Sequence, residues 1–445
     1  MAAMVAAAAM ADEPDVDLNI AELSGNAKVT WGVDLGSDAA GGGRTGFRNE
    51  TDAKLKVNIA NGGSKLTEGE GVWAELEVKV ADALVAEQGE IKGGKAAIET
   101  AKLHIGDLYV GIKSGDAQVG GLNLTNAIKS DKYGVQAKGE KDITEGIVAG
   151  YDTDLFGVAV DFRSKPVGTA DPKDYYTDQY AVAAEAELKD LAGFGAKAGV
   201  SYAFKSKTLG LFGSASYKLP LGDTTFVKAS AGVGFNKVGD AKLGAGELGA
   251  SVLFGWGDEN DDSQAGGYYL DNDGTKKRTP GVGVAAYVPL FKHTYIDIVP
   301  AFYSGEIIEN LTSAVLGEFI IPVDLGDTKP AFAFAGNVSY KLAVGDSITV
   351  TPQAGFRYAN ADYAAWSAEA APLAKAADAL TAKNTDNSGL TDNVFSADGL
   401  LNLKFGVEVG GLIDNTTFGA YYQSRNLVGG DDKAGTFNVF AKIAL

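Results

Sequence analysis

Alternation of apolar and polar residues with a period of two recurs along the chain and constrains its fold more than any other feature. In the final stretch, GTFNVFAKIAL (Gly435–Leu445), every second residue from Phe437 onward is apolar, and the intervening positions include Asn438 and Lys442. Successive side chains of a β-strand point to opposite faces, so this stretch predicts a strand with one apolar and one mostly polar face.

The first part of the chain repeats this pattern in strands that carry charges on one side. Three stretches alternate aliphatic residues with polar or ionisable ones: Lys28–Leu35, Ala53–Ile59 and Val72–Val80. In a soluble sandwich the polar side faces water, whereas in a transmembrane barrel the apolar side faces lipid and the polar side a wet lumen. The period of the pattern alone does not distinguish a soluble sandwich from a transmembrane barrel.

Further strands are expected throughout the rest of the chain. They are Ala101–Ile105, Leu108–Lys113, Tyr133–Gly139, Glu145–Tyr151, Phe156–Arg163, Tyr180–Leu188, Phe194–Phe204, Leu211–Lys218, Thr225–Phe235, Ala250–Trp256, Gly281–Pro289, Thr294–Tyr303, Val315–Pro322, Ala331–Lys341, Ser347–Tyr358, Leu401–Gly410 and Thr416–Gln423. The total is about twenty-one, an odd number, whereas single-chain bacterial barrels have even numbers of strands, so at least one segment is assigned wrongly.

The lengths of the segments favour the barrel. A tilted strand needs about 9–11 residues to cross a bilayer, which is close to the length of most of these segments. The sequence therefore predicts an all-β fold, a large antiparallel transmembrane β-barrel of about 20 strands, within a range of about 16–22, with long extracellular loops. The last strand is expected to close the barrel against Lys28–Leu35. Two long insertions, Asp258–Thr279 and Ala359–Asn393, are expected among the extracellular loops.

Composition excludes several classes of function. The net charge of −19 disfavours nucleic-acid binding, which needs a basic surface. Cysteine is absent, and the two histidines, His104 and His293, lie far apart without the spacing of a zinc site. The acidic residues of 258–273 do not follow the spacing of a calcium loop. We therefore expect no enzyme activity, no metal and no cofactor.

The first eleven residues, MAAMVAAAAMA, are interpreted as the remnant of a signal peptide that ends in a small-residue cleavage pattern. Residues 12–445 are expected to form a single outer-membrane barrel. A soluble, β-rich exported protein is the alternative fold.

Several stretches resemble the treponemal major outer sheath protein and its Tpr relatives. They are WGVDLG (Trp31–Gly36), TGFRNETDAKLKV (Thr45–Val57), VWAELEVK (Val72–Lys79), AKLHIGDLYVGI (Ala101–Ile112), KPAFAFAGNVSY (Lys329–Tyr340), PQAGFRYANADY (Pro352–Tyr363) and KFGVEVGGLIDNTTFGAYYQSRN (Lys404–Asn426). The resemblance implies an abundant, trimeric, pore-forming protein of the spirochaete outer membrane, in which some members also bind host matrix proteins.

The resemblance also divides the chain into an N-terminal region of about residues 21–190 and a C-terminal region of about 200–445. A bipartite arrangement, with a periplasmic N-terminal domain below a C-terminal barrel, is one alternative for this family. The amphipathic strands of the N-terminal region favour one barrel from both halves.

The leading functional hypothesis is a porin that lets small hydrophilic solutes diffuse through a lumen lined by charged side chains. The residues expected to line it are Arg44, Arg48, Lys54, Lys56, Glu75, Glu77, Lys79, Lys102 and Lys442. The loop Ser114–Lys132 is either an infolded constriction or an outer loop. An adhesin that displays its long loops on the barrel is the second hypothesis. The expected partners are membrane lipid, two further copies of the chain and host matrix proteins.

Overall fold

The computed structural model describes residues 21–36, 45–60, 72–87, 90–113, 119–122, 135–137, 145–164, 179–237, 245–257, 279–290, 295–305, 307–323, 329–345, 347–363, 398–429 and 433–444. Among these residues, no helix is both long and apolar enough to cross a membrane.

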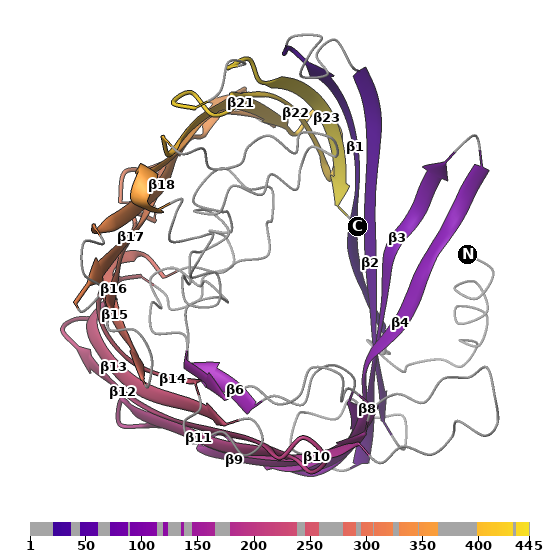
Figure 1. Cartoon of the computed structure of the whole chain (residues 1–445). Helices are drawn as coiled ribbons and strands as arrows, with labels where there is room; N and C mark the ends of the chain where they lie inside the picture. Colours follow the sequence, from indigo (N-terminus) through magenta and orange to yellow (C-terminus); the bar gives the residue numbers. More distant parts are fainter. Residues whose placement is uncertain are drawn as a thin grey trace, which may run out of the picture.

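Antiparallel β-strands make up almost all of this part of the chain (Figure 1). They are β1 (Ala21–Asp34), β2 (Thr45–Ala60), β3 (Val72–Glu87), β4 (Glu90–Ile105), β5 (Leu108–Lys113), β6 (Val119–Leu122), β7 (Val135–Ala137), β8 (Glu145–Asp152), β9 (Phe156–Ser164), β10 (Tyr180–Leu191), β11 (Phe194–Ala203), β12 (Thr208–Pro220), β13 (Thr225–Lys237), β14 (Ala245–Trp256), β15 (Gly281–Leu290), β16 (Tyr295–Tyr303), β17 (Leu311–Pro322), β18 (Ala331–Tyr340), β19 (Leu342–Val344), β20 (Ile348–Ala359), β21 (Leu400–Gly410), β22 (Thr416–Gln423) and β23 (Thr436–Ala444).

The strands form a closed ring. Twenty-one of those described belong to one sheet, in which the strands pair in chain order, except that β5 pairs with β8 and both β18 and β19 pair with β20; β23 pairs with β1. The two segments β18 and β19 pair in succession with the same neighbour, β20, so together they occupy one position. The described ring therefore has 20 strand positions, which agrees with the predicted barrel and its even number of strands.

One predicted wall strand, Tyr133–Gly139, is wrong and explains the odd total. Its described part is β7, which pairs only with β6 in a separate two-stranded sheet. This hairpin lies inside the ring near β10–β14 (Figure 1). The strand before it in the wall, β5, pairs directly with β8. The described strand has three residues, fewer than the roughly 9–11 that a wall strand needs to cross a bilayer.

Exposure along the strands follows the predicted period of two. In β1, Val29 and Trp31 are exposed on the outer surface, whereas Lys28 and Thr30 are buried on the inner side. Throughout the ring, the outer surface is mainly aliphatic and aromatic. Phe194, which begins β11, and Phe204, which directly follows it, both face outward and are ten positions apart. At a rise of about 3.3 Å per residue and a tilt of about 40°, this span corresponds to an apolar band about 25 Å tall.

The connections differ in length at the two ends of the ring. One end, called the short-turn end, carries tight turns such as Gly106–Asp107 and Ala192–Gly193. The other, called the long-connection end, carries most of the long segments between strands, including the one between β20 and β21. Bacterial barrels have short periplasmic turns and longer extracellular loops, so the long-connection end corresponds to the cell exterior.

The two long insertions leave the ring at opposite ends, so the expectation that both are extracellular is wrong. The backbone N–H of Gly257 donates to the carbonyl of Thr224 in the β12–β13 turn, at a distance of 3.0 Å, which places the β14–β15 connection at the short-turn end. Asn360, which follows β20, bonds to Phe332 at the start of β18, at the long-connection end. Most residues of both insertions lie outside the described part of the chain. Their opposite placement follows from the order of antiparallel strands, which residue composition does not reveal.

Candidate pore lining

Arg425 and Asp34 join the seam where the ring closes. Arg425 follows β22, and one of its guanidinium nitrogens donates to both carboxylate oxygens of Asp34 at the end of β1, at 2.8 Å each. Both side chains are buried. The N–H of Leu35 also donates to the carbonyl of Gly435, 2.9 Å away. Residues separated by most of the sequence thus fasten the long-connection end of the seam.

The inner wall of β10–β13 carries charges that reach solvent. Lys197 on β11 lies 2.6 Å from a carboxylate oxygen of Glu185 and 3.7 Å from one of Glu187, both on β10. The three side chains remain 23%, 27% and 43% exposed. Lys218 and Lys228, directly opposite each other on β12 and β13, continue the same wall. An interior with partly exposed charges is a feature of wet barrels.

Inward-facing lysines lie over aromatic rings on neighbouring strands. The ammonium groups lie between 4.3 and 5.2 Å from the ring centroids in four pairs: Lys28 with Phe440, Lys102 with Tyr109, Lys218 with Phe226, and Lys404 with Tyr421. Such cation–π contacts hold a charge against the wall. These contacts fix the positions of four positive charges on the inner surface.

Three of these rings lie over glycines of an adjacent strand. Tyr109 faces Gly150, Phe226 faces Gly255 and Phe440 faces Gly419. A Cβ built on any of the three glycines would overlap the opposing ring. Glycine within these strands therefore gives an aromatic ring room to lie against the wall, where any larger residue would push it inward. The stack of glycine, aromatic ring and lysine occurs at three separate places.

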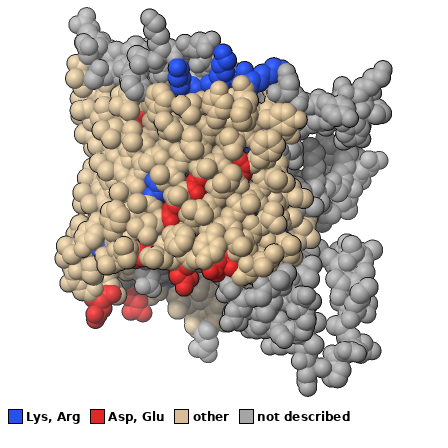
Figure 2. Space-filling model, turned by 90° about the horizontal axis from the view of Figure 1, so that it is seen from below, with Lys and Arg blue, Asp and Glu red and all other residues tan. Residues whose placement is uncertain are grey.

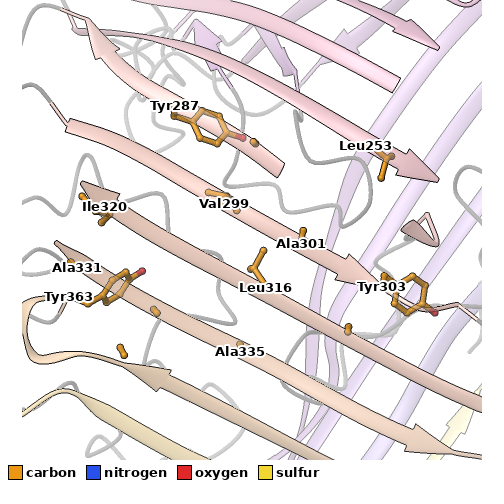
Figure 3. Packing of buried hydrophobic residues seen from close by; sticks show 14 of the residues in the cluster. Leu253, Tyr287, Val299, Ala301, Tyr303, Leu316, Ile320, Ala331, Ala335 and Tyr363 are labelled. Carbon is orange, nitrogen blue, oxygen red and sulfur yellow. The ribbon is translucent and has the colours of Figure 1, made fainter. Parts of the chain in front are cut away.

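The inner face of β15–β18 is mainly apolar, which distinguishes it from the charged wall (Figure 3). Its buried residues include Val299, Ala301, Leu316 and Ala335. Two acidic side chains, Asp297 and Glu318, are fully buried in this face. The hydroxyl of Tyr363, just after β20, donates to a carboxylate oxygen of Glu318. Burial first, and the Glu318 carboxylate second, raise the pKa of the Tyr363 hydroxyl well above its usual range, so it stays protonated as a donor.

The predicted lining residues fall into three groups. Arg44 lies outside the described residues. Arg48, Lys54, Lys56, Glu75, Glu77 and Lys79 lie on β2 and β3, where the structure describes the backbone but not these side chains. Lys102 and Lys442 are described and face inward, Lys102 over Tyr109 and Lys442 directly opposite Lys28.

The register pairs residues of β2 and β3 with one another and with residues of β1 and β4. Arg48 is opposite inward-facing Thr30, and Lys56 is opposite Glu77. Glu75 is opposite Lys102. Directly opposed residues of antiparallel strands share a face. That these residues line a pore stays a prediction.

Five charged residues of the inner wall were not predicted from the sequence: Glu185, Glu187, Lys197, Lys218 and Lys228. Their strands were predicted, but Ala and Gly occupy so many positions on both faces of β10 and β11 that the contrast between the faces is weak. Among the described residues, no group of three or more His, Cys, Asp or Glu side chains is placed to hold a metal ion.

Comparisons with known proteins confirm the treponemal resemblance. The chain is 26% identical to the major outer membrane protein MspA of Treponema maltophilum, over 98% of this chain and 97% of that protein. It is 27% identical to the major surface protein MspTL of Treponema lecithinolyticum, over 98% and 94%. No protein-family model matches.

Solved structures similar to the chain include OpdQ of Pseudomonas aeruginosa, at 11% identity and a TM-score of 0.39, covering 96% of this chain and 98% of that one. OccAB2 of Acinetobacter baumannii has 10% identity and a TM-score of 0.39, covering 97% and 99%. The ring of strands and the treponemal relatives together identify an outer-membrane β-barrel protein.

Proposed function

We propose that this outer-membrane barrel is a general-diffusion porin for small hydrophilic solutes. The observation that carries the proposal is the wall of partly exposed charges formed by Lys197, Glu185 and Glu187 inside a closed ring of 20 strand positions. Barrels of about 16–18 strands already leave an aqueous channel, because the diameter grows with strand number faster than side chains can fill it. Passage through such a lumen needs no catalytic group and no cofactor.

The β6–β7 hairpin is the element that narrows this lumen in our proposal. It lies inside the ring near β10–β14, beside the charged wall. The residues before and between its two strands include most of Ser114–Lys132, the segment proposed from the sequence as a constriction. A hairpin facing a wall of fixed charges is the arrangement that sets both the size limit and the field that a solute meets.

Charges of both signs lie together on the described wall. Lys197 is held between Glu185 and Glu187, which supports a field across the pore rather than a strong preference for one sign of ion. We expect weak ion selectivity. The net charge of the whole chain does not determine it, because charges outside the lumen contribute little to the field within.

Adhesion to host matrix proteins is the second proposed function, and the topology restricts it. The β20–β21 connection leaves the long-connection end, whereas the β14–β15 connection leaves the other end. Only the first of these is available for adhesion in the orientation inferred above. One relative is named a major surface protein, which supports exposure at the cell surface.

Two points of assembly are also proposals. The first is a single barrel domain over residues 12–445, supported by the membership of β1–β5 in the same sheet as β8–β23. The second is a homotrimer in the membrane, which is implied by the family resemblance.

Swelling of liposomes that contain the purified full chain tests the porin proposal. In solutions of uncharged sugars of increasing mass, we expect swelling rates that fall with sugar size to a cut-off. Liposomes with heat-unfolded protein are the control. Rates equal to those of empty liposomes for the smallest sugar, with folded protein inserted, would exclude a diffusion pore.

A further inference from the structure

Opposite charges collect at the two edges of the lipid-facing surface of β9–β13 (Figure 2). At the long-connection end, Lys205 and Lys207 lie in the turn between β11 and β12. Lys237 ends β13 directly opposite Leu209 of β12, which brings it beside that turn. We call these three residues the basic rim. It is notable because the chain as a whole has a net charge of −19.

The opposite edge is acidic. Four aspartates are exposed there: Asp154 and Asp223 lie in turns at the short-turn end, and Asp152 and Asp190 lie at the ends of β8 and β10 beside such turns. One lysine, Lys189, forms an ion pair with Asp152 at 2.8 Å. Between the two edges lies a band of mainly uncharged residues, as Figure 2 shows. The asymmetry therefore belongs to the edges of the membrane-facing band, where headgroups meet the protein.

Outward-facing aromatic residues lie directly below the basic rim. Tyr202 and Phe204 pack edge to face with centroids 5.3 Å apart, and Phe162 stacks on Tyr180 at 5.6 Å. Aromatic girdles mark the interface between the hydrocarbon core and the headgroups. Because Phe204 immediately precedes Lys205 in the sequence, the lysines lie at headgroup depth, just beyond the apolar band.

We propose that the basic rim binds the anionic headgroups of lipids in the leaflet at the long-connection end. Lysine carries a compact charge on a flexible stem, which suits a phosphate oxygen without fixed geometry. Its aliphatic stem lies along apolar surface while the ammonium group reaches the headgroup layer. A basic rim attracts anionic lipid when several charges act together, and added salt weakens the attraction. The acidic edge opposite repels the same headgroups and so favours one orientation.

The test measures which lipids stay with the full-length protein. Protein is reconstituted in nanodiscs of equal parts phosphatidylglycerol and phosphatidylcholine, then extracted gently, and the bound lipids are quantified by mass spectrometry. We expect phosphatidylglycerol to be enriched about threefold or more, less so at high salt. The variant Lys205→Gln/Lys207→Gln/Lys237→Gln should lose the enrichment. The matched control Asp154→Asn/Asp223→Asn, at the acidic edge, should retain it.

Heat-modifiable migration on gels confirms that both variants fold. Absence of enrichment in the unmodified protein, or equal loss in both variants, would overturn the proposal. Binding of heparin through the three lysines without enrichment of phosphatidylglycerol would also overturn it, in favour of a soluble polyanion. Pore activity does not enter the readout, so this test fails or succeeds independently of the porin proposal.

Discussion

Single glycines on the inner wall decide where aromatic rings and lysines lie. Gly419 gives room to the ring of Phe440, over which the ammonium group of Lys28 lies 4.9 Å from the centroid. The substitution Gly419→Ala puts a Cβ into the space of that ring. We expect it to displace the ring from the wall and to lower the free energy of unfolding by about 1–3 kcal/mol, a typical cost of overpacking. Urea titration in detergent micelles measures this change.

Gly213→Ala is the matched control, because Gly213 also lies within a wall strand but a Cβ there meets no atom within 4 Å. Alanine should be neutral or mildly stabilising at this position, by up to about 1 kcal/mol, because it restricts the unfolded chain. Equal stability of the two alanine variants would contradict the role assigned to the three glycine–aromatic stacks.

A second prediction for a single residue concerns Tyr363 and the dependence of stability on pH. Burial and the nearby Glu318 carboxylate raise the pKa of its hydroxyl in the folded protein. Above about pH 10 the unfolded tyrosine loses its proton whereas the folded one keeps it, so the unfolded state binds fewer protons and stability falls as pH rises. We expect the Tyr363→Phe variant to show a smaller loss of stability between about pH 9 and pH 11 than the unmodified protein. Tyr340→Phe, on the outer face, is the control. An identical alkaline slope in all three proteins would refute the assignment.

At the scale of strands, the seam between β1 and β23 is the most specific feature that the sequence predicted. Val29 and Ala441 are directly opposite each other on the outer face. The native chain contains no cysteine, so the variant Val29→Cys/Ala441→Cys has a clean background. Oxidation of the folded protein should join the two strands and shift its migration on a denaturing gel.

The pair Val29→Cys/Val407→Cys is the control, since Val407 lies on β21, which does not neighbour β1. Cross-linking of the control to the same extent, or failure of the seam pair in folded protein, would favour a barrel closed without the N-terminal strands.

The β6–β7 hairpin yields a prediction about pore size. Replacing residues 116–140, which contain both strands, by a short flexible linker removes the element from the inside of the ring. We expect faster swelling of liposomes and a larger sugar cut-off. Shortening the β20–β21 connection by the same number of residues is the control for loss of chain length. An unchanged cut-off would show that another segment limits the pore.

Sequence patterns predicted the strands of the ring but not the character of each wall. In β1 and β23, lysine and asparagine alternate with aliphatic residues, so the contrast between faces was visible. In β16, inward-facing Val299 and Ala301 alternate with outward-facing Ile298 and Phe302, and apart from Asp297 both faces are mainly apolar. The alternation of residues along this strand then does not show which of its faces points into the barrel. Only the pairing with β15 and β17 assigns the faces.

For the whole molecule, the sequence predicted ring closure and approximate size, because both depend on a repeated local pattern. The contact between Asp34 and Arg425 could not be predicted from the sequence, since the two residues are 391 positions apart and no spacing rule connects them. The placement of the β14–β15 connection also needed the full order of strands. Successive strands run in opposite directions. One strand too many or too few in the prediction therefore moves every later connection to the wrong end of the barrel.

Single-channel recording in planar bilayers tests the central claim most directly, namely that the ring encloses a continuous aqueous pore. Detergent-purified, folded full-length protein should produce discrete conductance steps, with weak ion selectivity in a salt gradient. The heat-unfolded protein at the same concentration should produce none. The absence of steps from protein that is folded by heat-modifiable migration would contradict the claim and leave the barrel as a scaffold only.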